Sequence, residues 1–292
     1  MMSKFLLFLM LGLPALTISF NYPAIEMARF YLYARLRKIL NSKIKEEGVE
    51  SRRGWIRVFE RWTLYSKSIE GPQSSDPLFP SVYPNKIDYS TLVAELAYLE
   101  GMDIMKAQRV ADVLISNSLY FSSKLSEQTL RTKSKGAVSL ATHPAPRNKI
   151  DVEFIGETAF LKLLPQQVIK TKTNLRRPFK ININCLKKLS QLWSPTMLSS
   201  APIDDIPGEW KQLKKSKTAF LSDVFVLLAR YNSLEGHGYQ AGISESVFSY
   251  LEKSFGVTTE LFASPLNCNL KRYCSLFPDI DSGNYCTSEY IE

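Results

Sequence analysis

The sequence predicts an α+β protein whose N-terminal part is mostly helical and whose C-terminal end begins an open α/β sheet. Before residue 121, apolar residues recur at three- and four-residue spacing, which is typical of helices that bury one face. After residue 150 the apolar period changes to two in short stretches, and a helix–strand–turn unit follows near residue 260. A hydrophobic fraction of 45% with 12% aromatic residues excludes a disordered chain.

Residues 21–121 are predicted to be a helical region. The apolar spacing predicts one helix over residues 25–46, with arginines and lysines on its outer face, and a second over residues 55–65. Glycine, serine and proline at residues 71–84 indicate a linker, and the apolar stripe after it predicts one or two helices over residues 90–120. The N-terminal part is therefore expected to be mostly helical.

Residues 122–149 are predicted to be a flexible basic loop, because they are polar and contain Gly136, Pro144 and Pro146. His143 lies in this segment, directly before a proline. A catalytic histidine at this position would lack a rigid support, so we expect no catalytic role for it.

Residues 150–256 are predicted to form a second unit of strands and helices. Alternating apolar residues predict strands within residues 152–163 and 179–183. Three helices are expected in this unit, at residues 185–193, around the apolar stretch 220–231, and between Ser244 as N-cap and Gly256 as stop. An apolar strand over residues 257–263 follows the last helix.

The charge and the cysteines limit the kind of partner. The formal net charge of +9 favours anionic partners such as RNA, DNA or an acidic membrane, although a solvated basic surface explains it equally well. The four cysteines contain no CxxC pair and have no histidine nearby, so we expect no metal site. Reduced thiols of a cytosolic or nuclear protein fit them better than a disulfide scaffold.

Residues 1–20 form an apolar leader that resembles a secretory signal, with Lys4 before the apolar stretch 5–13 and small residues at 17–19. The stretch is short for a membrane-spanning helix, and Pro14 interrupts it. The chain contains no Asn-x-Ser/Thr glycosylation site, which disfavours secretion. A buried helix and a non-authentic start are the alternatives.

The turn after the strand at residues 257–263 is the candidate ligand site. In an open α/β sheet, ligands bind at the carboxyl ends of the strands, where the turns face the crevice. Ser264 and Asn267 are expected to hydrogen-bond a small ligand, while Pro265 holds the turn rigid. The alternative is an ordinary turn at the edge of a core.

Residues 262–268, Tyr273-Cys274 and Phe277-Pro278-Asp279 resemble the phosphorylated-CTD-interacting-factor family, the cap-specific adenosine N6-methyltransferases. The resemblance extends over residues 225–279 and, more loosely, over residues 178–189. It implies a Rossmann-like methyltransferase domain whose incomplete start is residues 257–292. It also implies an S-adenosylmethionine pocket, to which it assigns Phe262, Ala263, Ser264, Pro265, Leu266 and Asn267.

The family transfers a methyl group to N6 of the adenosine beside the mRNA cap, and its catalytic motif is Asn-Pro-Pro-Phe. The present sequence contains neither this tetrad nor Asp-Pro-Pro-Tyr, so no residue is assigned a catalytic role. No second apolar strand is visible in residues 280–292, and a single buried strand would lack backbone partners. The chain is therefore expected to be truncated before the catalytic motif and inactive.

Capped mRNA is the partner that the resemblance implies. Two basic segments together would contact RNA phosphates, although for either segment alone a solvated basic face is the favoured interpretation. Their candidate residues are Lys170, Lys172, Arg176, Arg177, Lys180, Lys214 and Lys215. The family's WW module is expected to be absent from this sequence, so the phosphorylated C-terminal domain of RNA polymerase II is a partner by family association only. The resemblance implies a nuclear or cytoplasmic location. The alternatives are a non-catalytic RNA-binding remnant and, because of the leader, a secreted or membrane-attached protein.

Overall fold

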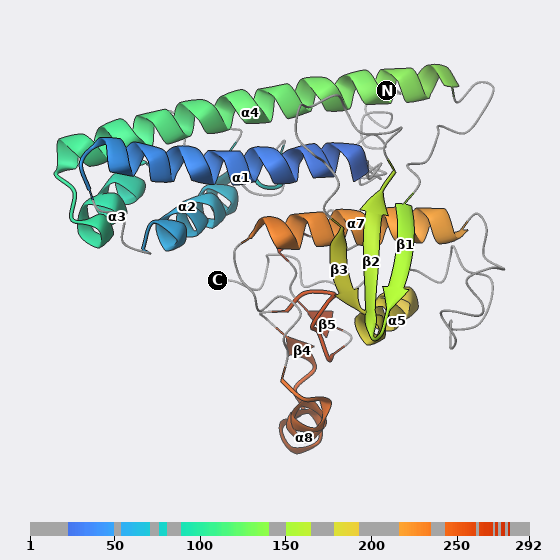
Figure 1. Cartoon of the computed structure of the whole chain (residues 1–292). Coiled ribbons are helices and arrows are strands. Elements are labelled where there is room, and N and C mark those ends of the chain that lie inside the picture. Colours follow the sequence, from blue (N-terminus) through green and yellow to red (C-terminus); the bar gives the residue numbers. More distant parts are fainter. Residues whose placement is uncertain are drawn as a thin grey trace, which may run out of the picture.

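Figure 1 shows the computed structural model of the chain. The structure describes residues 23–49, 54–70, 76–80, 89–139, 150–164, 178–192, 216–234, 243–260, 263–270, 272–273, 276–277 and 280. Its helices are α1 (Pro23–Glu46), α2 (Gly54–Glu70), α3 (Ser90–Glu100), α4 (Ile104–Ser139), α5 (Ile183–Leu192), α7 (Ser216–Ser233) and α8 (Glu245–Phe255). Its strands are β1 (Ile150–Ile155), β2 (Thr158–Leu163), β3 (Phe179–Asn182), β4 (Thr259–Glu260) and β5 (Arg272–Tyr273). The predicted α+β class is confirmed.

Helix α1 is the centre of the molecule. It packs along the long helix α4 on one side and on α7 on the other (Figure 1). Its apolar residues at three- and four-residue spacing, including Tyr33, Leu36, Leu40 and Ile44, are fully buried. Helices α2 and α3 close the far end of this helical layer. The helix predicted at residues 25–46 is therefore confirmed, within two residues at its start.

The strands β1, β2 and β3 form an antiparallel sheet in that order, with Leu161 opposite Phe179. One face packs on α7 (Figure 1). On this face the ring of Phe179 stands edge-on to two others, 5.1 Å from Phe225 of α7 and 5.3 Å from Phe30 of α1, measured between ring centroids. The alternation that predicted the strands arises because successive residues point to opposite faces of the sheet, one buried and one exposed, as is common in antiparallel sheets.

The loop predicted at residues 122–149 is wrong over residues 122–139, because α4 continues to Ser139. Phe121 and Leu125 are buried, 3% and 1% exposed, and Thr129 donates a hydrogen bond to the carbonyl of Leu125 at 2.8 Å. A helix that buries one stripe needs an apolar residue only every third or fourth position, so a polar composition does not exclude it. Residues 140–149, with His143, lie outside the described residues.

The predicted boundary between a helical region and a second unit does not interrupt the core. Buried residues of α1, of the β1–β3 sheet and of α7 belong to one hydrophobic cluster, in which Leu36, Leu161 and Phe225 are all fully buried. The two regions are therefore packed on each other through α1 and α7.

The C-terminal end contains a short parallel pair, in which Thr259 is opposite Arg272 and Glu260 opposite Tyr273. The expectation that the strand here would lack a partner is wrong, since β5 supplies one. Before it, Gly256 ends α8 with a φ of 65°, as its predicted role as helix stop requires. Helix α8 lies apart from the main core (Figure 1), and none of its residues is buried. None of the described helices is both long and apolar enough to cross a membrane, and the leader at residues 1–20 lies outside them.

Candidate functional site

The predicted ligand turn lies between the parallel strands β4 and β5 and is closed by its own hydrogen bonds. The backbone N–H groups of Asn267 and Cys268 donate to the carbonyl of Ser264 at 3.1 and 2.9 Å. Oδ1 of Asn267 accepts from the backbone N–H of Ser264 at 2.7 Å and from its hydroxyl at 2.8 Å. The hydroxyl oxygen of Ser264 in turn accepts a hydrogen bond from the backbone N–H of Leu266 at 3.2 Å. The two polar side chains therefore hold the turn's shape.

The turn is anchored to the core at three points. Leu266 and Cys268 are buried, 1% and 4% exposed, and Nζ of Lys188 on α5 donates to the carbonyl of Cys268 at 3.0 Å. Beyond β5, the ring of Phe277 packs against that of Tyr231 on α7, with centroids 5.1 Å apart. This arrangement fixes the turn against α5 and α7.

The predicted cofactor residues thus lie together in one turn, but the polar side chains of Ser264 and Asn267 hydrogen-bond each other. Ser264, Pro265 and Leu266 are buried, Ala263 and Asn267 are half-buried, and Phe262 lies outside the described residues. A ligand at this turn would meet its backbone and its edge, while Ser264 and Asn267 bind each other. Their role towards S-adenosylmethionine stays a prediction.

The predicted RNA-binding residues are mostly outside the described chain, namely Lys170, Lys172, Arg176, Arg177, Lys214 and Lys215. Lys180 is exposed on β3, on the sheet face turned away from α7. Its ammonium lies 5.6 Å from the centroid of the Phe160 ring on β2. The acidic residues Asp151 and Glu153 are exposed on the neighbouring strand β1, so this face carries both signs of charge.

The family model described as "Phosphorylated CTD interacting factor 1 WW domain" matches residues 188–286, which include the turn, its Lys188 anchor and α7. Over residues 188–286 the chain is therefore similar to the phosphorylated CTD interacting factor family. Two relatives, from Homo sapiens and Mus musculus, are each 47% identical to this chain over 68 residues and bear the name mRNA (2'-O-methyladenosine-N(6)-)-methyltransferase. The match covers 21% of this chain and 10% of each relative, so the chain spans about a tenth of their length.

The matching family model is described as a WW domain, whereas the spacing of the tryptophans predicted that the family's WW module is absent from this chain. The described residues of the family-matched segment form the end of α5, helices α7 and α8, and the parallel pair β4–β5. The resemblance that was seen in residues 225–279 is therefore confirmed and extends further upstream.

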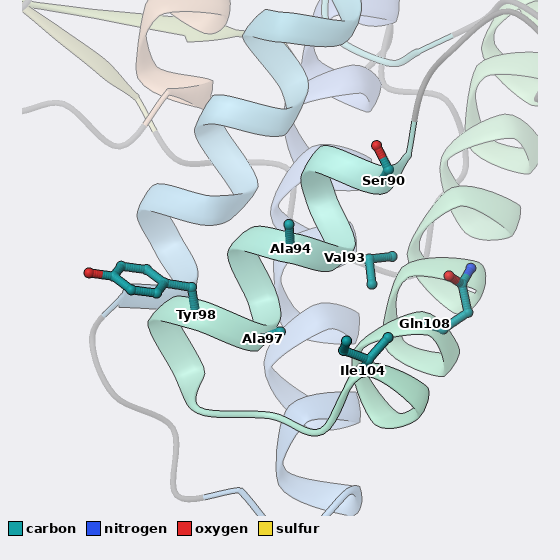
Figure 2. Close-up of a pocket in the computed structure, with 7 residues that line it drawn as sticks. All are labelled: Ser90, Val93, Ala94, Ala97, Tyr98, Ile104 and Gln108. Carbon is teal, nitrogen blue, oxygen red and sulfur yellow. The ribbon is translucent and has the colours of Figure 1, made fainter.

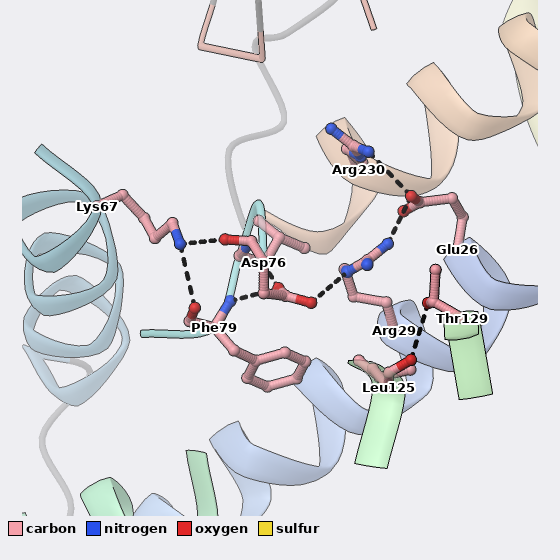
Figure 3. A network of polar contacts seen from close by, with 9 residues as sticks. Glu26, Arg29, Lys67, Asp76, Phe79, Leu125, Thr129 and Arg230 are labelled. Carbon is pink, nitrogen blue, oxygen red and sulfur yellow. Dashed lines mark hydrogen bonds and ion pairs between the residues drawn. The ribbon is translucent and has the colours of Figure 1, made fainter. Parts of the chain in front are cut away.

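A buried cluster of charges joins the family-matched segment to the helical layer (Figure 3). Nη2 of Arg230 on α7 donates to Oε1 of Glu26 on α1 at 2.9 Å, and Nη1 of Arg29 lies 2.5 Å from the same oxygen. Nε of Arg29 donates to Oδ2 of Asp76 at 3.1 Å. Oδ1 of Asp76 accepts the backbone N–H groups of Leu78 and Phe79, and Lys67 of α2 donates to the carbonyls of Asp76 and Phe79.

No sequence pattern predicted this cluster, which we name the Glu26–Arg230 cluster after its central pair. Glu26, Arg29, Asp76 and Arg230 are each at most 6% exposed. Burial favours the neutral form of Glu26, but the charges of Arg230 and Arg29 and their hydrogen bonds outweigh it and lower its pKa from 4.5 to about 2. One signal was present: Arg230 interrupts an apolar run, and an arginine buried there requires a carboxylate partner.

The lowered pKa of Glu26 predicts a stability that depends on pH. Because the folded protein holds this carboxyl ionised, its contribution is complete above pH 4.5 and is lost as the pH falls towards 2. The pKa difference corresponds to about 3 kcal/mol. We expect urea unfolding to show that the stability gap between wild type and Glu26→Gln narrows as the pH is lowered through this window. A gap that stays constant would contradict the assignment.

An open apolar groove of about 600 Å³ lies at the corner between α3 and α4 (Figure 2). Its lining residues are Ser90, Val93, Ala94, Ala97, Tyr98, Ile104 and Gln108. None of them is charged, and the groove belongs to the helical layer, not to the family-matched segment. The described residues contain no group of side chains that could hold a metal ion, and neither Cys185 nor Cys268 forms a disulfide there.

Proposed function

We propose that the protein is an mRNA cap-adenosine N6-methyltransferase-like protein that uses the Ser264–Cys268 turn to bind S-adenosylmethionine. The observation that supports this most is the parallel β4–β5 pair, because it sets the turn at the carboxyl end of β4. The 47% identity over 68 residues to proteins named as such methyltransferases supports this reaction class. S-adenosylmethionine would supply the methyl group.

The protein's own residues would then shape and shield the cofactor side of the site. The Ser264–Asn267 hydrogen bonds hold the turn in one conformation before a ligand arrives, which lowers the entropy cost of binding. Buried Leu266 and Cys268 exclude water beneath the turn. No adenine-gripping residue is assigned, since the 292-residue sequence contains no Asn-Pro-Pro-Phe. We therefore propose that this polypeptide by itself binds cofactor without transferring methyl.

Titration calorimetry with S-adenosylmethionine tests the proposal. Wild-type protein is expected to bind, and Asn267→Ala is expected to weaken binding about tenfold, because Ser264 loses its hydrogen-bond acceptor and the turn relaxes. Asn184→Ala, an exposed change on α5, is the control and should leave binding unchanged. Failure of the wild type to bind would refute the cofactor proposal. Radiolabelled methyl transfer to capped RNA beginning with 2'-O-methyladenosine would refute the proposed inactivity.

A second candidate is an RNA-binding protein without cofactor. The pairing of Lys180 with Phe160 on the open sheet face and the net charge of +9 favour it. Salt-sensitive binding of capped RNA by protein that does not bind S-adenosylmethionine would favour this candidate over the first.

Location and further partners follow the same proposal. A nuclear or cytoplasmic location, capped mRNA and the phosphorylated tail of RNA polymerase II are the associations that family membership supports. Fractionation of cells that express the tagged protein tests the location, and N-terminal sequencing of the product tests the signal-like leader.

A further inference from the structure

One side chain connects the candidate cofactor turn to the rigid part of the molecule. Lys188 reaches from α5 to the turn, where its ammonium donates to the backbone carbonyl of Cys268 at 3.0 Å across 80 residues of sequence. The N–H of Cys268 already donates to the carbonyl of Ser264. Both backbone polar groups of the last turn residue are therefore bound, one within the turn and one to α5.

Helix α5 is a firm support for this bond. Its residues Leu186 and Leu189 are buried in the core, 0% and 5% exposed, on either side of Lys188. The backbone N–H of Ile183, where α5 begins, donates to the carbonyl of Glu157 in the β1–β2 hairpin at 2.9 Å. A hydrogen bond from a charged donor is stronger than one from a neutral donor, so the Lys188 ammonium is well suited to hold a backbone carbonyl in place.

We propose that Lys188 is a positioning residue that holds the Ser264–Cys268 turn in its ligand-binding conformation through the Cys268 carbonyl. The positioning of the turn is inferred from the hydrogen bond between Lys188 and Cys268. Its effect on ligand binding rests on the proposed cofactor function. Without the ammonium, the Cys268 carbonyl loses its hydrogen bond to α5, and the turn loses this link to the helix. The turn then opens more often, and any ligand must close it at the cost of affinity.

Native-state hydrogen exchange of the full chain tests the positioning directly. Lys188→Met removes the ammonium and keeps the length of the apolar stem. We expect the amides of Leu266, Asn267 and Cys268, all hydrogen-bonded to Ser264, to exchange at least about tenfold faster. The buried α4 amides of Val110 and Leu114 should keep their rates, because the change acts locally.

Two variants separate positioning from charge or helix damage. Lys188→Arg retains a charged donor and should restore turn exchange to within about threefold of wild type. Lys187→Met removes a neighbouring lysine of the same helix and the same half-burial, and should leave the turn unchanged. Unchanged turn exchange in Lys188→Met, or equal acceleration in Lys187→Met, would overturn the proposal.

Calorimetry with S-adenosylmethionine on the same variants distinguishes the positioning of the turn by Lys188 from the proposed binding of the cofactor. If the wild type binds, Lys188→Met should bind about tenfold more weakly and Lys188→Arg close to normally. If the wild type does not bind while the turn of Lys188→Met exchanges faster, the cofactor function fails and the positioning of the turn by Lys188 stands. If binding survives unweakened although the turn opens, Lys188 does not position the turn for the ligand.

Discussion

Glu26→Gln is expected to lower the free energy of unfolding by about 3–5 kcal/mol. The change keeps the volume of the side chain but leaves two buried guanidinium groups, Arg29 and Arg230, facing a neutral amide. Arg29 retains Asp76, while Arg230 loses its ion pair with the Glu26 carboxylate and keeps its position over the ring of Phe277, 5.6 Å from the centroid. The loss of the carboxylate between two buried guanidinium groups is therefore the main cost. Urea unfolding at neutral pH measures it.

Glu46→Gln is the matched control for this prediction. It removes a carboxylate from the same helix, but that carboxylate is exposed and pairs with Lys43 at 3.2 Å. Surface pairs of this kind contribute about 0–1 kcal/mol, so little change is expected. A double variant, Glu26→Leu with Arg230→Met, should be less destabilised than the two single changes added together, because neither charge is left alone. Simple additivity would contradict the buried pair.

Phe179→Ala is expected to cost about 3–5 kcal/mol as well, by a different route. The ring is 4% exposed and packs edge-on between Phe30 of α1 and Phe225 of α7, so its removal opens a cavity where the sheet and both helices meet. Chemical denaturation measures the loss.

Phe160→Ala is the control, since Phe160 lies in the same sheet with its ring on the open face beneath Lys180. Phe160 is only partly buried, so we expect a cost of no more than about 1 kcal/mol. Similar losses for the two alanine variants would show that the buried face of the sheet has been assigned wrongly.

Periodicity alone predicted most of the helices and the antiparallel strands, because each of them buries one face. It failed where the buried stripe was sparse: α4 beyond residue 122 keeps Leu125 inside while its other positions are mostly polar. It also failed for β5, because two residues, Arg272 and Tyr273, are too few to display a period. Helices and strands were thus predictable where many residues share one apolar pattern, and not where only one or two residues carry it.

The candidate site was predictable as a turn but not as a network. The residues 264–268 identify the turn in the sequence, yet the use of Asn267 Oδ1 by Ser264 depends on backbone geometry that no spacing rule supplies. The partners Lys188 for Cys268 and Glu26 for Arg230 lie far away in the chain, so only the folded structure reveals them.

The central place of α1 has a consequence for synthesis of the protein. Glu26 and Arg230 are 204 residues apart, so at the usual 5–20 residues per second the ribosome makes the second about 10–40 s after the first. Until then, the side of α1 that will face α7 has no packing partner. This side includes the carboxylate of Glu26, which is buried in the folded protein. Such late, long-range closure slows folding and exposes apolar surface to aggregation. The nascent chain is therefore expected to depend on chaperones that shield α1 until α7 arrives.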